Sequence, residues 1–145
     1  MIVEILNQLL EHSKHCIQVR EDPNLPMPGF SVIEKDLHGR YIPLILINQK
    51  LFPNDKNVYA HILAHEWGHH VCNHILLEPP PMHLRPKPSE IQEKENEADL
   101  FAAKFIKKYN YNFGPGTIII IIPGLAGPIL APSCAYIGAC SNTIK

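Results

Sequence analysis

The 145-residue chain lacks a Cys-x-x-Cys pair among its cysteines. The four are Cys16, Cys72, Cys134 and Cys140. A zinc site built from cysteines is therefore not expected. The first residues, MIVEILNQLLEHSK, also lack the basic start and the unbroken apolar run of a signal peptide. We therefore expect a cytoplasmic protein with free thiols, because disulfides are rare in reducing compartments.

The sequence also lacks an excess of either charge. The formal net charge is −1 at pH 7, and the tight basic cluster consists of Lys104, Lys107 and Lys108 alone. Domains that bind nucleic acid usually carry a broad basic face, so we expect no nucleic-acid partner. The length is typical of one domain, and a hydrophobic content of 46% is ordinary for a globular protein.

No acidic or basic residue occurs between Tyr109 and Ile144. A membrane-spanning helix needs about 20 apolar residues, and this stretch is long enough, but three prolines (Pro123, Pro128 and Pro132) interrupt it. We expect residues 1–112 to form the domain and residues 113–145 to form an apolar tail. In that tail a strand over 117–122 would precede an irregular apolar stretch that is packed on the domain or poorly ordered. The alternative is a membrane segment through residues 117–140.

The apolar periodicity of the rest of the chain predicts a small α+β domain. Proline-rich stretches mark the loops, and Ser89 followed by Gln92 predicts a capping box at the start of the last helix. We expect a helix over 2–15, a loop over 21–29, a β-hairpin from 30–36 and 41–51, a helix over 55–77, a connection over 78–88, and a helix over 90–109.

Five histidines gather in YAHILAHEWGHHVCNH, residues 59–74. Pairs four residues apart lie one helical turn apart and can reach one zinc ion. The spacing allows three such pairs: 61/65, 65/69 and 70/74. A hydrolytic zinc site also needs a general base, which follows the first ligand in the His-Glu-x-x-His pattern. Only His65 is followed by a glutamate, so HEWGH, with His65, Glu66 and His69, is the catalytic register.

A third ligand is expected from another element, because a catalytic zinc usually has three protein ligands and an open position. The stretch ENEAD offers Glu95 and Asp99, which share one face of the last helix. One of these carboxylates can bind the metal, while the other accepts the free N–H of a ligand histidine. Glu97 lies about 200° around the helix from Glu95 and is expected to point away.

AHEWGHH, followed about 25 residues later by ENEADLFAAKF, resembles the ImmA/IrrE family of small zinc metallopeptidases. It is similar, more distantly, to thermolysin-type enzymes. The likeness covers residues 30 to about 106. It implies a zincin-like fold and one Zn²⁺ held by His65, His69 and Glu95. It further implies that Glu66 is the base, that Asp99 orients a ligand histidine, and that a helix-turn-helix repressor is the protein substrate.

The other histidines of the stretch are expected outside the metal site. His61 is expected at the rim or in a hydrogen bond, whereas His70 and His74 lie about 140° and 180° from His65 and should face away. A donor for the developing oxyanion stays open among four residues: Tyr41, Tyr59, His83 and Tyr111.

Two other functions are compatible with the same residues. A non-catalytic zinc-binding interaction module would keep the three ligands but would not need Glu66. A membrane-anchored metalloprotease would use the apolar tail as its anchor.

Overall fold

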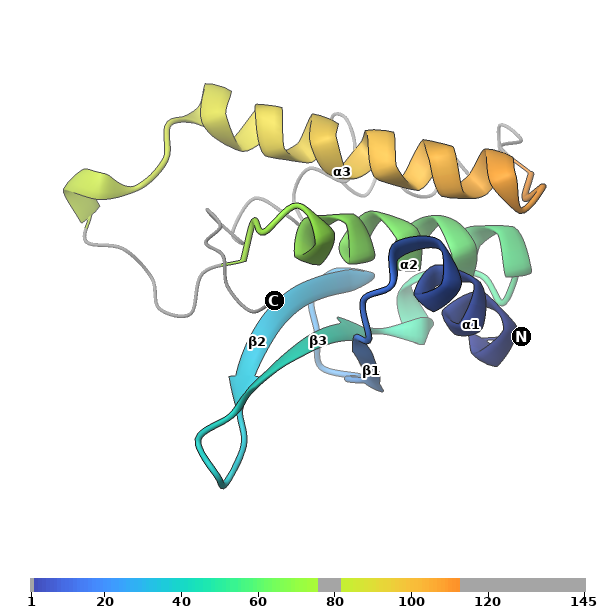
Figure 1. Ribbon diagram of the computed structural model, residues 1–145, viewed down its shortest axis with the longest axis horizontal. Coiled ribbons are helices and arrows are strands. Elements are labelled where there is room, and N and C mark those ends of the chain that lie inside the picture. Colours follow the sequence, from blue (N-terminus) through green and yellow to red (C-terminus); the bar gives the residue numbers. More distant parts are fainter. Residues whose placement is uncertain (1, 76–81, 113–145) are drawn as a thin grey trace.

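The computed structural model describes residues 2–75 and 82–112, and these residues form three helices and one three-stranded sheet (Figure 1). The predicted α+β class is confirmed. The elements are α1 (Ile2–Ser13), β1 (Gln18–Glu21), β2 (Gly29–Lys35), β3 (Tyr41–Ile47), α2 (Lys56–Val71) and α3 (Pro88–Lys108), with short 3-10 helices η1 (Gln49–Leu51) and η2 (Met82–Leu84).

The sheet has the order β1-β3-β2. β2 and β3 form the predicted antiparallel hairpin, which turns through Gly39 at a positive φ of 79°, where glycine carries no steric penalty. β1 pairs with β3 in parallel and was not predicted. β3 ends at Ile47, earlier than predicted, because the Asn48 side chain accepts a hydrogen bond from the amide of Lys50 and starts η1.

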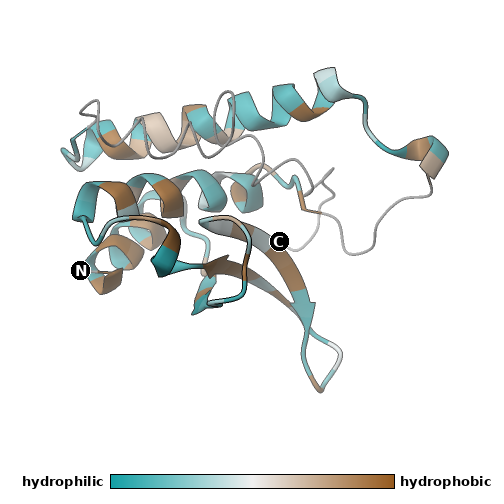
Figure 2. Cartoon of the chain, turned by 180° about the vertical axis from the view of Figure 1, so that it is seen from behind, coloured by the Kyte–Doolittle hydropathy of each residue, from teal (hydrophilic) through white to brown (hydrophobic). Residues whose placement is uncertain are grey.

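Helix α2 lies between the sheet and α3 (Figure 1). It is therefore buried on nearly all sides. Its residue Trp67 is 1% exposed, and the indole N–H of Trp67 donates a hydrogen bond of 2.8 Å to the Ser13 hydroxyl. Figure 2 shows hydrophobic and hydrophilic residues alternating along the outer helices, as expected when only one face meets the core. The core residues around α2 include Leu9, Ile45, Leu63, Ala102 and Phe105.

Both long helices have ends that differ from the prediction. α2 begins after Asp55, whose carboxylate accepts from two backbone amides, but it ends at Val71 rather than near residue 77. The chain leaves the helix through Asn73, which has a φ of 60°. α3 begins at Pro88, and the Glu90 carboxylate accepts from the amide of Lys87 at 3.2 Å. The predicted capping box of Ser89 and Gln92 was therefore wrong by two residues.

The strand predicted over 117–122 and the packing of the tail lie outside the described residues. Within residues 2–75 and 82–112, no helix is both long and apolar enough to cross a membrane.

Candidate metal centre

Three buried side chains from two helices meet where α2 packs against α3. His65 and His69 lie one turn apart on α2, and Glu95 comes from α3. Their exposed fractions are 1%, 1% and 3%, respectively. One ligand atom from each residue lies within 4.8 Å of the others. These three residues can therefore hold a metal ion.

A glycine between the two histidines allows the helices to approach this closely. A Cβ added at Gly68 would lie 3.0 Å from the carbonyl oxygen of Ala98 and 3.1 Å from the Cβ of Phe101. Both distances are shorter than ordinary van der Waals contact, and one of the atoms belongs to the α3 backbone. Gly68 therefore sets the distance between the helix that carries the histidines and the helix that carries Glu95.

The atoms that face one another within the cluster fit a cation. The Nε2 atoms of His65 and His69 lie 3.4 Å and 3.3 Å from the two carboxylate oxygens of Glu95. Within the described part of the chain, His69 Nε2 and both Glu95 oxygens are buried without a hydrogen-bond partner. Buried polar atoms without a partner are rare and costly. A metal ion would satisfy them, and two imidazoles with one carboxylate are a donor set that zinc uses.

The protonation of the cluster follows from burial and from the charges nearby. Burial lowers the pKa of His69 to about 4, although Glu95 opposes this shift, so His69 is neutral near pH 7. Burial would raise the pKa of Glu95, but the two histidines outweigh it and lower the pKa to about 2. Burial also opposes a charge on His65, yet Asp99 and Glu95 raise its pKa to about 10. Metal binding would release a proton from His65, because a ligand histidine must be neutral.

Asp99 lies beside the first histidine of the cluster. Its Oδ1 is 2.8 Å from Nδ1 of His65. The Asp99 side chain is about half exposed, at 48%, whereas His65 is buried. A carboxylate in this position fixes which ring nitrogen of His65 carries hydrogen and directs the other nitrogen into the cluster.

Glu66 is on α2 directly after His65, and its side chain meets strand β2. It is 2% exposed, and its Oε1 accepts a hydrogen bond of 2.7 Å from the hydroxyl of Ser31, which is itself 1% exposed. A Cβ at Gly29 would lie 3.1 Å from Cγ of Glu66. Neither Ser31 nor Gly29 was predicted from the sequence to lie at the site. The available signal was a pair of small residues at alternate positions at the start of the strand, before the apolar residues Val32 and Ile33.

The two histidines expected to face away from the cluster behave differently. His70 does face the sheet, and its Nε2 lies 3.0 Å from the carbonyl oxygen of Leu44. The expectation for His74 was wrong. Its Nδ1 lies 2.9 Å from Nδ1 of His69, and its Nε2 lies 2.6 Å from Oε1 of Glu97.

The early end of α2 is the physical reason for this difference. A helical position 74 would lie on the far side of α2 from the cluster. Because the chain instead reverses at Asn73, the amide of His74 donates to the carbonyl oxygen of His69 at 2.8 Å. The imidazole of His74 is thereby buried, at 2% exposed, between His69 and Glu97.

The structure assigns none of the four candidate oxyanion donors to the cluster. Tyr59 packs its ring on Phe52, the Tyr111 hydroxyl donates to Gln8, and Tyr41 lies under the ammonium of Lys35. His83 lies in η2, which has no buried residue. On α2 itself, His61 is partly buried one turn before His65, and burial lowers its pKa to about 4.

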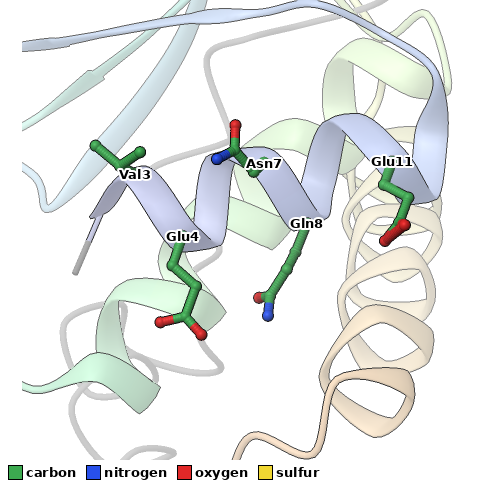
Figure 3. A pocket seen from close by; sticks show the side chains of 5 residues that line it. All are labelled: Val3, Glu4, Asn7, Gln8 and Glu11. Atoms are coloured by element: carbon green, nitrogen blue, oxygen red, sulfur yellow. The ribbon is translucent and has the colours of Figure 1, made fainter.

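A shallow depression elsewhere on the surface runs along α1 (Figure 3). Two of its residues already have partners: Glu4 forms an ion pair with Lys56, and Gln8 accepts from Tyr111. The depression includes no residue of the metal cluster. Its lining residues are Val3, Glu4, Asn7, Gln8 and Glu11.

Comparison of the chain with models of protein families, with curated proteins and with solved structures finds no match.

Proposed function

We propose that this protein is a zinc-dependent metallopeptidase. The observation that carries the proposal is the buried cluster of His65, His69 and Glu95. Glu66, which supplies a further buried carboxylate, directly follows His65 in the sequence. A cluster that only stored or sensed a metal would not need an additional buried carboxylate beside it. Hydrolysis does need one, because a base must take a proton from water during attack on the amide.

Each residue of the proposed site would have one role in hydrolysis. His65, His69 and Glu95 would hold one Zn²⁺, which would act as a Lewis acid on the scissile carbonyl and make water more acidic. Glu66 would accept the proton of the attacking water and deliver it to the leaving amine. The hydroxyl of Ser31 would hold the Glu66 side chain in place. No covalent bond between enzyme and substrate is required.

The finer assignments rest on the resemblance of HEWGH and ENEAD to the ImmA/IrrE pattern. On that basis we propose a zincin-like domain over residues 1–112, a cytoplasmic location and a helix-turn-helix repressor as the substrate.

The proposal is tested by metal analysis and by one conservative substitution. Purified protein should contain about one zinc, as a three-ligand site requires. Glu66→Gln should keep the zinc and lose cleavage of a peptide library, because the amide cannot accept the proton. Glu93→Gln removes the same charge from an exposed position on α3 and should cleave like the wild type.

Each assignment has its own contradictory result. A wild type that binds no zinc would refute the site, and a Glu66→Gln variant that still cleaves would refute the mechanism. If zinc binds but nothing is cleaved, and the spectrum of the cobalt-substituted protein shows four protein ligands, the chain is the non-catalytic module instead.

A further inference from the structure

Each ligand histidine of the cluster has a partner at the ring nitrogen that points away from Glu95. For His65 this partner is a carboxylate, that of Asp99. For His69 it is a second imidazole, that of His74, and behind it stands the carboxylate of Glu97. The three side chains form a chain of two short hydrogen bonds, with heavy-atom distances of 2.9 Å and 2.6 Å.

Only one arrangement of hydrogens along this chain leaves His69 ready to bind a metal. A carboxylate only accepts hydrogen bonds, so Nε2 of His74 must carry hydrogen and donate to Glu97. A neutral imidazole has one N–H, and Nδ1 of His74 is then a bare acceptor. His69 must therefore carry its hydrogen on Nδ1 and donate to His74. Its Nε2, which faces Glu95, is left bare.

We propose that His74 and Glu97 are positioning residues that hold His69 in the tautomer and orientation in which Nε2 binds the metal. This inference rests on the proposed metal site and adds two residues to it. Glu97 acts through His74 and does not itself reach the metal. The orientation of a ligand histidine by an acceptor on its other nitrogen is a general feature of protein metal sites.

The burial of the chain supports this role. His74 is 3% exposed at its side chain, and its Nδ1 is directed at a ligand rather than at solvent. Glu97 is 57% exposed, so its carboxylate remains in contact with solvent while one of its oxygens holds the buried imidazole. Three acidic residues of α3 thus lie in or around the cluster. Glu95 belongs to it, Asp99 contacts His65, and Glu97 contacts His74.

Four single variants of the full-length chain test the role. His74→Phe keeps a ring but cannot accept from His69, whereas His74→Asn places an amide oxygen near the position of Nδ1 and can accept. Glu97→Gln has an amide that can donate to His74 and reverse the chain of hydrogens. Glu93→Gln, one turn earlier on α3 and also exposed, controls for the lost charge.

The first readout is zinc affinity, measured by competition with a chelator of known affinity. We expect zinc binding to weaken about 10- to 100-fold in His74→Phe and about 10-fold in Glu97→Gln. His74→Asn should recover most of the affinity, and Glu93→Gln should match the wild type. Thermal unfolding in the presence of chelator shows whether each variant is folded.

The second readout is the tautomer of His69, observed by ¹⁵N NMR of the imidazole rings in zinc-free protein. The wild type should carry hydrogen on Nδ1, and Glu97→Gln should shift the population towards hydrogen on Nε2. A role limited to packing would not move this signal.

The outcomes separate this inference from the proposed function. If the wild type binds zinc and the folded Glu97→Gln and His74→Phe variants bind it equally well, the role of His74 and Glu97 is overturned while the metal site stands. A wild type without affinity for zinc would overturn the proposed function, and the positioning role with it.

Discussion

The hydroxyl oxygen of Ser31 lies 2.7 Å from Oε1 of Glu66 and 2.9 Å from the backbone oxygen of the same residue. Both residues are buried. This contact joins strand β2 to helix α2, and it holds in place the side chain that is proposed as the general base. A hydrogen bond to a charged group stabilises by about 1.5–3 kcal/mol, enough to select one position of a carboxylate.

Ser31→Ala is expected to slow peptide cleavage without loss of zinc. A loss of about 1.5 kcal/mol of orientation energy corresponds to roughly a 10-fold lower kcat/KM. Steady-state kinetics and metal analysis of the same preparation measure both quantities.

A second serine serves as the control for this substitution. The Ser13 hydroxyl accepts from Trp67 on the same helix α2 but does not bond to Glu66. Ser13→Ala should lower the unfolding temperature and leave kcat/KM per folded molecule unchanged. If Ser31→Ala cleaves as fast as the wild type, the hydroxyl does not position the base.

Asp99→Ala is expected to weaken zinc binding about 10-fold, because the acceptor that orients His65 is removed. Asp99→Asn keeps an oxygen that can accept from Nδ1 of His65, so its zinc affinity should lie between that of Asp99→Ala and that of the wild type. Chelator competition gives the dissociation constants. Equal affinities for Asp99→Ala and wild type would show that packing alone orients His65.

The parts of this structure that could be predicted are those set by local spacing. The row of His65 and His69, with Glu66 between them, depends only on the 3.6-residue period of one helix. Placing Glu95 and Asp99 beside that row also required knowledge of how α2 and α3 pack. The resemblance to a known pattern supplied this information, whereas periodicity could not.

The missed features depend on backbone changes or on register between distant elements. His74 was placed on the far side of α2 because the helix was extended past Val71, and the reversal at Asn73 has no strong local signal. Ser31 faces Glu66 only because β2 lies on that side of α2. β1 was missed because it has four residues, mostly exposed, and pairs with a strand far along the chain.

Gly68→Ala is expected to destabilise the protein. In an open helix this change stabilises by about 1 kcal/mol, but here the new methyl group would meet the α3 backbone at Ala98. Overpacking of this kind costs about 1–3 kcal/mol, so after the helix gain is subtracted a net loss of up to about 2 kcal/mol is expected in urea unfolding. Zinc affinity should also fall, because the ligands lie on both helices. A variant more stable than the wild type would show that the helices separate without strain.

His70 should make the zinc-free protein less stable as the pH falls below neutrality. Burial lowers its pKa from 6.5 to about 4, with a smaller contribution from the charge of His15. The unfolded chain therefore binds a proton between about pH 6.5 and pH 4 that the folded protein does not bind. This part of the stability is complete above pH 6.5 and is lost progressively towards pH 4.

The variant His70→Gln isolates this contribution, since its amide can still donate to the carbonyl oxygen of Leu44 but does not titrate. Urea unfolding at pH 7 and pH 5, in the presence of chelator, gives the loss of stability for each protein. At about 1.4 kcal/mol per pKa unit, the wild type should lose roughly 1–2 kcal/mol more than the variant. Since the other buried histidines titrate in both proteins, only the difference between the two losses reports on His70. Equal losses would mean that His70 is already protonated in the folded state or is exposed to solvent.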